Sequence, residues 1–239
     1  GVGTSIATAG GSILVRADGG NLNADPSSLI SGDSVALSAY GDLTPGNVVA
    51  TKADVGGVSA LSVTAGAGAV VGIDLQNADL VATLGSISLT SPTSVRVGSG
   101  TAFSASAVNV TAPDLNLASN FTLPAVVNLI PSSGSMTITG VGNTLTNLGT
   151  LSKISNMTAN LDNQGTFIVP GGMSTTLSGT LANNVTGTIQ LYGADFIGNA
   201  TLTVANGFTN DGLIELGTSP NSGFHGILNV SSGTLLNSV

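Results

Sequence analysis

The chain has 239 residues, of which 34 are glycine and 7% are charged, with no cysteine and a formal net charge of -8 at pH 7. Without cysteine it can hold neither a disulfide framework nor a thiolate metal site. An acidic surface repels phosphate backbones and anionic lipids, and no apolar stretch is long enough to cross a bilayer, so we expect no nucleic acid and no membrane insertion.

Hydrophobic residues make up 41% of the chain, which is the opposite of the signature of disorder. Aromatic residues make up only 3% and tryptophan is absent. A core without large aromatic side chains must be built from many small increments of Val, Ile and Leu. The composition therefore favours a regular, repetitive architecture.

Short runs typical of β-strands recur along the chain with one pattern, a small residue followed by apolar positions that alternate with Ser or Thr. The first apolar residues of the runs follow one another at intervals of about 20–28 residues, the length of one solenoid coil. These residues are Ile13, Val35, Leu61, Ile87, Val108 and Met136.

The pattern is least regular where Pro113, Pro124 and Pro131 cluster. We therefore expect first coils over residues 1–112, an irregular coil or side loop over 113–133, and a second type of coil over 134–239. No composition shift separates independent domains, so we interpret residues 1–239 as a single segment of a larger protein.

The second type of coil repeats an apolar residue, then Asn two positions later, then usually Gly. Asn tolerates left-handed backbone and Gly adopts it freely, so these positions are predicted as corners between strands. Asn side chains of stacked coils can also hydrogen-bond to one another along the axis, as amide ladders do. The predicted corner ladder consists of Asn147, Gly149, Asn163, Gly165, Asn183, Gly187, Asn210, Gly212 and Asn237.

These observations predict an all-β fold, a right-handed parallel β-helix of roughly nine or ten coils. A sandwich or jelly roll needs no coil-length repeat, and a membrane barrel needs aromatic girdles. Helix is disfavoured by the density of Thr, Val, Gly and Asn. The matching pairs of the C-terminal part extend this repeat: Gly187-Thr-Ile-Gln-Leu with Gly212-Leu-Ile-Glu-Leu, and Leu202-Thr-Val with Leu228-Asn-Val.

The segments that begin at Leu161, Gly187, Phe208 and Gly226 resemble the repeats of filamentous haemagglutinin-like adhesins and of autotransporter passenger domains. The resemblance covers most of the chain and is one of repeat style. It implies a right-handed β-helix, export to the bacterial cell surface and a role in adhesion.

Candidates for chemistry are few. His225 is the only histidine, so a loop residue is the favoured interpretation over a metal ligand. Some β-helix enzymes cleave glycans with clustered carboxylates, but the acidic residues here are scattered along the sequence, and we expect no enzyme, no cofactor and no metal. The acidic residues considered are Asp74, Asp79, Asp195, Asp211 and Glu215.

Three further possibilities receive low weight. The loop that begins at Gly19 matches a calcium-binding repeat only loosely. Thr-x-Thr pairs suggest ice binding, but the pairs at Thr137, Thr144 and Thr201 do not recur once per coil. Glycosylation sequons are expected by chance in such a chain; they lie at Asn109, Asn120, Asn156, Asn184, Asn199 and Asn229.

The sequence thus predicts a secreted, non-catalytic stalk or fibre segment of a bacterial surface protein. Its expected partners are a host-cell or surface receptor or glycan, or further copies of itself in a fibre. The alternative is a glycan-binding or glycan-cleaving β-helix such as a phage tailspike.

Overall fold

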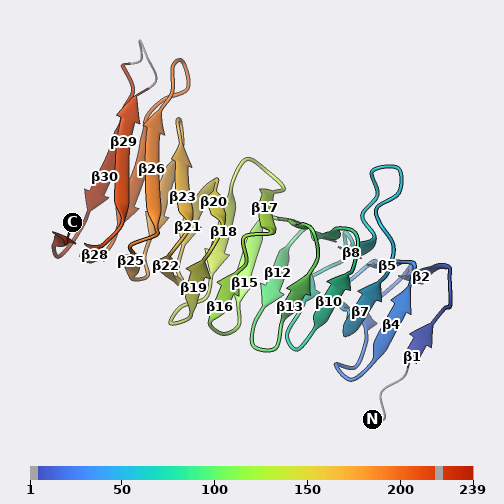
Figure 1. The fold of residues 1–239 in the computed structure, drawn as a ribbon. Coiled ribbons are helices and arrows are strands. Elements are labelled where there is room, and N and C mark those ends of the chain that lie inside the picture. Colours follow the sequence, from blue (N-terminus) through green and yellow to red (C-terminus); the bar gives the residue numbers. More distant parts are fainter. Residues whose placement is uncertain (1–4, 219–222, 239) are drawn as a thin grey trace. The chain divides into compact units, whose positions relative to one another are not determined.

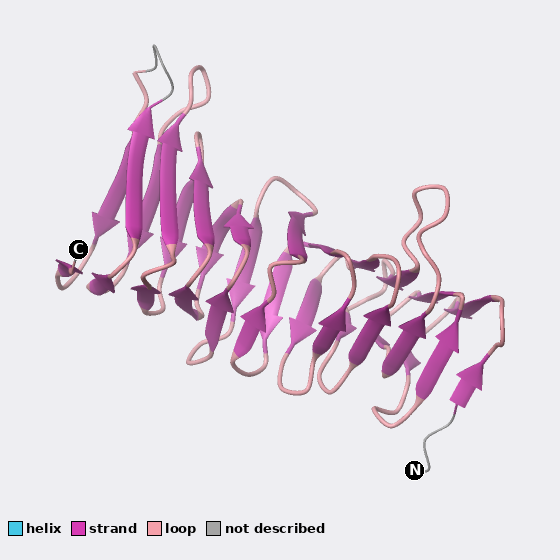
Figure 2. Ribbon diagram, viewed as in Figure 1, coloured by secondary structure: helices cyan, strands magenta, loops and turns pink. Residues whose placement is uncertain are grey.

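A computed structural model describes residues 5–218 and 223–238. The chain divides into two units, unit 1 with Gly1–Ala118 and Val126–Ser132, and unit 2 with Ser119–Ala125 and Ser133–Val239. Throughout the described ranges the chain forms strands, turns and loops with no helix (Figure 2). Strands of successive turns pair in parallel, so the predicted all-β parallel solenoid is confirmed, with about ten turns counted over both units.

Unit 1 is built from three parallel sheets, and each turn contributes one strand to each sheet (Figure 1). The first sheet contains β1 (Ser5–Ala7), β4 (Leu29–Gly32), β7 (Asn47–Ala50), β10 (Asp79–Ala82) and β13 (Ala102–Ser104). The second contains β2 (Ser12–Ala17), β5 (Ser34–Ala39), β8 (Leu61–Ala65), β11 (Ile87–Thr90), β14 (Val108–Ala112) and β17 (Val127–Pro131). The third contains β3 (Leu22–Asn23), β6 (Leu43–Thr44), β9 (Ile73–Asp74), β12 (Ser94–Val97) and β15 (Asp114–Leu117).

The strands of unit 2 likewise belong to three sheets of the five that the described chain forms. One contains β18 (Met136–Thr139), β21 (Ile154–Met157), β24 (Ser174–Leu177), β27 (Ala200–Val204) and β30 (Gly226–Val230). The next contains β16 (Phe121–Leu123), β19 (Thr144–Asn147), β22 (Asn160–Asn163), β25 (Leu181–Asn183), β28 (Phe208–Asn210) and β31 (Leu235–Asn237). The last contains β20 (Thr150–Ser152), β23 (Thr166–Pro170), β26 (Thr188–Gly193) and β29 (Leu213–Thr218).

The predicted repeat of unit 1 is confirmed residue by residue. Ile13, Val35, Leu61, Ile87 and Val108 pair in register from β2 to β14 and form one column of buried side chains. Alternate residues of a strand point to opposite faces, so the same register turns the intervening Ser and Thr residues outward. Each turn therefore adds a layer to the core without a large aromatic side chain.

Met136 does not belong to this column, contrary to the expectation from its spacing. The position above Val108 is occupied by Val127 of β17, whereas Met136 begins β18 of another sheet. The sequence pattern of β17 is weak because the strand ends in Pro131. The next clear strand pattern after Val108 is therefore that of β18, one strand further along the chain.

The stretch 113–133 was expected as an irregular coil or side loop, and it contains three strands, β15, β16 and β17. Here the chain passes between the two units: β17 pairs with β14 of unit 1, and β16 pairs with β19 of unit 2. Pro113 and Pro124 lie between strands, and Pro131 is the last residue of β17.

The C-terminal repeats are confirmed in unit 2. Ile189 pairs with Ile214, and Leu202 pairs with Leu228. The largest fully buried side chain is Phe167, which lies between Leu151 and Ile189 in its column. No helix in the described ranges is long and apolar enough to cross a membrane.

Candidate functional site

A continuous column of asparagines, buried in its first four members, runs through unit 2 at the ends of β19, β22, β25, β28 and β31. Each side-chain amide donates to the amide oxygen of the Asn in the next turn, at donor–acceptor distances of 2.8, 2.7, 2.6 and 2.6 Å. The column consists of Asn147, Asn163, Asn183, Asn210 and Asn237. The first four are at most 3% exposed, so the sequence-predicted residues form a single internal ladder.

Each of the inner amides also donates its second hydrogen to a backbone carbonyl. Asn147 donates to Thr166 O and Asn163 donates to Thr188 O, both at 3.2 Å. These carbonyls belong to the first residues of strands of the next turn, across the corner. Because a buried amide without partners costs free energy, complete pairing makes the ladder stabilising and fixes the register of the turns.

The glycines that follow the Asn residues also form a column, because the residues directly after them, Thr150, Thr166, Thr188 and Leu213, pair in register. The column consists of Gly149, Gly165, Gly187 and Gly212. Gly187 stands four residues after its Asn instead of two, so this corner is longer by two residues. The alignment therefore assigns Gly187 to the same structural position as the other three.

The prediction that these corners need a left-handed backbone is wrong. None of the ladder Asn residues and none of the four glycines has a positive φ. Glycine is needed for close approach: a Cβ on Gly165, Gly187 or Gly212 would lie within 3.0 Å of a backbone oxygen of the preceding turn. Those corners bring one backbone directly onto the next, with Thr188 N donating to Gly165 O at 2.8 Å.

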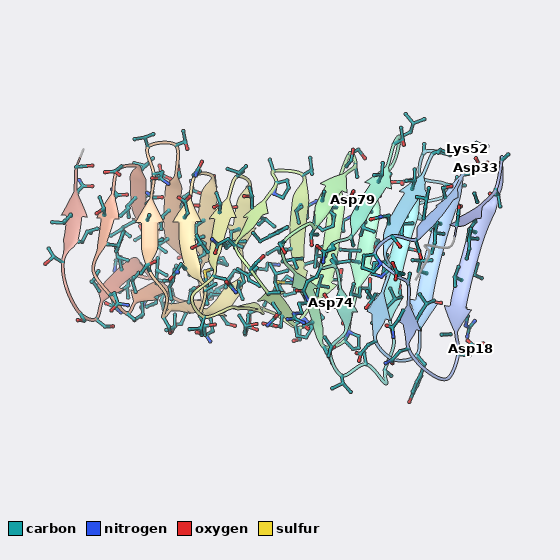
Figure 3. All side chains as sticks on the ribbon, turned by 90° about the horizontal axis from the view of Figure 1, so that it is seen from below. Asp18, Asp33, Lys52, Asp74 and Asp79 are labelled. Atoms are coloured by element: carbon teal, nitrogen blue, oxygen red, sulfur yellow. The ribbon has the colours of Figure 1, made fainter. Side chains whose placement is uncertain are left out.

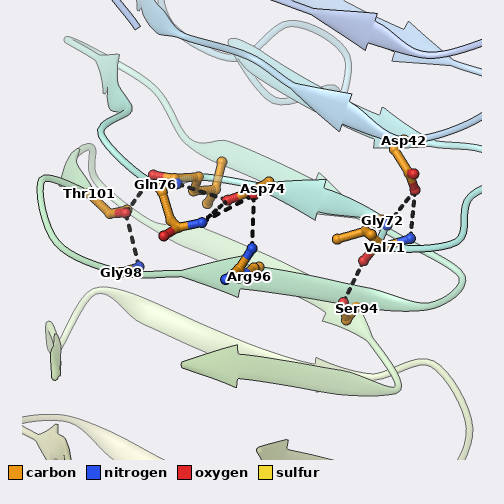
Figure 4. Close-up of polar contacts among 10 residues, drawn as sticks. Asp42, Val71, Gly72, Asp74, Gln76, Ser94, Arg96, Gly98 and Thr101 are labelled. Atoms are coloured by element: carbon orange, nitrogen blue, oxygen red, sulfur yellow. Dashed lines mark hydrogen bonds and ion pairs between the residues drawn. The ribbon is translucent and has the colours of Figure 1, made fainter. Parts of the chain in front are cut away.

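The carboxylates of unit 1 are used to hold turns together. The Asp42 carboxylate accepts hydrogen bonds of 2.7–2.8 Å from the backbone N–H groups of Val70, Val71 and Gly72 (Figure 4). Partial burial raises the pKa of Asp42, but these three hydrogen bonds to the charged form lower it by more, so the pKa lies below its usual value. Asp42 thus joins its own turn to the next turn of the solenoid.

Asp74 has a similar role on the outer surface. It lies beside Arg96 of the adjacent strand, with Oδ2 3.5 Å from Arg96 Nη1, and Gln76 Nε2 donates to both of its oxygens at 3.2 Å (Figure 4). Half-exposed pairs of this length contribute little free energy. Figure 3 shows that Asp74 and Asp79 lie apart from each other and from Asp18.

The acidic residues of unit 2 also have local partners. Glu215 Oε2 accepts from Gln190 Nε2 at 2.7 Å and from the Tyr192 hydroxyl at 2.9 Å. That hydrogen bond raises the pKa of Tyr192. Asp211 accepts from the Ser238 hydroxyl. In the part of the chain that the structure describes, no three His, Asp or Glu residues gather as metal ligands.

His225 lies in the exposed loop before β30, where its backbone N–H donates to Asn199 Oδ1 at 2.8 Å. This is the loop position that the sequence predicted. Asp195, the remaining carboxylate considered, lies in the short β-hairpin closed by two 3.0 Å hydrogen bonds between Ala194 and Gly198. Phe196 at its tip has a positive φ of 60° and is fully exposed.

A second hairpin projects from unit 1 between β7 and β8, visible as the raised loop beside β8 in Figure 1. Reciprocal backbone hydrogen bonds of 3.1 and 3.0 Å join Val55 and Val58. The two residues between them, Gly56 and Gly57, have φ of 59° and 80°. Positive φ at both central residues defines the type I′ turn, which matches the twist of the flanking strands and strongly favours Gly.

The base of this hairpin is fixed by Asp54. Its carboxylate accepts from Ala60 N at 2.7 Å, from Ser86 N at 2.9 Å and from the Ser86 hydroxyl at 2.7 Å. The hydrogen bonds from Ser86 are the main reason why the pKa of Asp54 lies below its usual value. The hairpin is thereby attached to the next turn of the solenoid, 32 residues further along the chain.

The hairpin stands beside an outward face that carries hydroxyl groups in two columns. Strand pairing aligns the positions of Ser62 and Ser88 in one column, and of Ser38, Thr64, Thr90 and Thr111 in the other. A pattern of Thr-x-Thr pairs does not reveal this array, because the array combines Ser with Thr. The Thr137 and Thr144 pairs lie on different sheets, on β18 and β19.

Comparison with protein-family models, with curated proteins and with solved structures finds no match. Function must therefore be inferred from the residues and their geometry.

Proposed function

We propose that this chain is a structural and adhesive segment of a secreted bacterial surface protein, a non-catalytic stalk or fibre section. The observation that carries the proposal is the Asn ladder within in-register stacked turns. The buried amides of the ladder form hydrogen bonds between successive turns. A repetitive scaffold requires such hydrogen bonds, and an active site does not.

The carboxylates support the same function. Several of them accept hydrogen bonds from a neighbouring turn, as Asp42 and Asp54 do in unit 1 and Glu215 does in unit 2. A general acid or base must be free to exchange a proton with a substrate, and a pKa lowered by backbone donors disfavours that role near neutral pH. The adhesin-like repeat style of the sequence agrees with export and display on a cell surface.

The test uses antibodies raised against the purified chain. They should label intact cells of the source organism, and brief protease treatment of intact cells should remove the labelling. Labelling that appears only after the cells are lysed would contradict display at the surface. Turnover on a panel of polysaccharides, abolished by Asp195→Asn or Asp211→Asn, would overturn the non-catalytic assignment.

A further inference from the structure

A cavity of about 220 Å³ lies in unit 1 between the projecting hairpin and the outward face of the second sheet. Its floor carries the side chains of Ser12, Ser34, Ala36 and Ser62. The hairpin residues Val55 and Val58 form the wall and remain 75% and 66% exposed. Sites for drug-sized ligands have volumes of roughly 300–1,000 Å³, so this cavity suits a smaller group such as a single sugar ring.

The floor offers hydroxyl groups that are available to a ligand. Ser34 donates to Ser12 Oγ at 2.7 Å, which leaves the Ser12 hydroxyl hydrogen free to donate. Ser62 uses its hydroxyl in no side-chain hydrogen bond among the described residues. A hydroxyl both donates and accepts, so this floor fits a ligand whose own groups are hydroxyls.

The cavity carries no charge. All of its lining residues are Ser, Ala or Val. The nearest charged side chains in the sequence are already paired: Lys52 Nζ lies 2.7 Å from Asp33 Oδ2, and the Asp54 carboxylate is taken up by the hairpin base. A phosphate, sulfate or uronic acid would be desolvated here without a counter-charge, which disfavours acidic ligands.

We propose that this cavity binds one sugar unit of an uncharged polysaccharide, with the sugar hydroxyls on the serine floor and the C–H face of the ring against Val55 and Val58. Binding sites for small ligands combine apolar walls with a few placed polar groups in this way. The free Ser and Thr columns continue from the floor at the strand spacing of about 4.8 Å. They offer neighbouring sugar units a hydroxyl contact at each turn.

The hairpin is built to keep this wall in place. The type I′ turn fixes its tip, and the Asp54 hydrogen bonds fix its base against Ser86. A Cβ on Gly85 would lie 2.6 Å from Asp54 Oδ1 and 2.7 Å from Ala60 Cβ, so the close fit between hairpin and sheet depends on glycine. A preorganised wall reduces the ordering cost of binding.

The inference specifies the adhesive part of the proposed function and rests on it. The full chain is immobilised and tested against two neutral polysaccharides, a β-glucan and a mannan, and against heparin and polygalacturonate. At least one neutral polysaccharide should bind, and the two acidic ones should not. Ala36→Phe places a ring in the cavity from an outward-facing position and should weaken binding at least tenfold. Val58→Ser removes part of the wall and should weaken it in the same direction.

The matched control is Ile130→Phe, which places the same ring on the outward face of the same sheet, outside the cavity and outside the hydroxyl columns, and should leave affinity within about twofold. Circular dichroism verifies that each variant is folded. Absence of neutral-glycan binding, preference for heparin, or equal binding by the chain and by Ala36→Phe would each overturn the cavity as a sugar site. If antibodies still label intact source cells in that case, the surface function stands and this site alone is wrong.

Discussion

Replacement of Asn163 by Ala tests the ladder at a buried position that makes three hydrogen bonds. Asn163 is fully buried; it accepts from Asn147 Nδ2 at 2.8 Å, and it donates to Asn183 Oδ1 at 2.7 Å and to Thr188 O at 3.2 Å. The variant leaves three buried groups short of a partner. Each unpaired group costs about 1–3 kcal/mol, and the group of the longest hydrogen bond costs least, so we expect the free energy of unfolding to fall by about 3–6 kcal/mol.

The measurement is urea unfolding followed by far-ultraviolet circular dichroism. With a dependence of about 2–3 kcal/mol per molar urea, the midpoint should fall by about 1–3 M. Turns of a solenoid can also unfold separately. Hydrogen exchange should therefore show that protection is lost first in β22 and β23, the strands that flank the substituted corner.

The control is Asn206→Ala, because Asn206 is exposed in a bend of the same unit and its side chain makes no hydrogen bond to any residue that the structure describes. It should change stability by no more than about 0.5 kcal/mol. Equal midpoints for the two variants would refute the stabilising role of the ladder. Asn163→Asp adds a second check: a buried carboxylate has a raised pKa in the folded chain, so this variant should gain stability as the pH falls towards 4.

Three further predictions follow from the same geometry. Gly165→Ala places a methyl group against the backbone of the preceding turn and should cost about 1–3 kcal/mol in urea unfolding, whereas Gly20→Ala, in open space, should cost less than 1. Phe167→Ala empties the largest buried position and should cost about 3–5 kcal/mol in the same assay. The pKa of Asp42 is lowered in the folded chain. The charged carboxylate therefore stabilises the fold above the ordinary Asp pKa of about 3.9, and this stabilisation is lost as the pH falls through the lowered pKa. The urea midpoint of Asp42→Asn should accordingly fall less steeply with acid than that of the unchanged chain.

Much of the fold could be predicted because its signals are local. Alternation of apolar residues with Ser and Thr identifies strands, and a recurrence close to one coil length identifies the stacking. The column from Ile13 to Val108 and the ladder from Asn147 to Asn237 follow directly, since residues that recur once per coil at the same place in the pattern meet in a parallel stack. The amide groups could be placed next to one another before any coordinates, because equivalent Asn residues of successive turns lie one strand spacing apart, within hydrogen-bond reach of each other.

The role of the glycines could not be predicted, because it depends on the backbone of another turn. Gly165 has ordinary φ and is needed where Gly149 O approaches, a contact that local conformational preferences do not reveal. The position of Met136 was missed for a related reason. Turn lengths vary, so equal spacing along the chain does not ensure the same sheet.

The amino-acid sequence by itself determined the fold class, the buried columns and the chain of Asn residues, because each follows from a short pattern that recurs once per coil. Only the tertiary structure decided which outward hydroxyls align, where the hairpin of Val55 and Val58 stands and which turn its Asp54 holds. Those features depend on groups such as Asp54 and Ser86, which lie 32 residues apart. Their distance in space is set by the summed lengths of every intervening turn, and no local pattern encodes that sum.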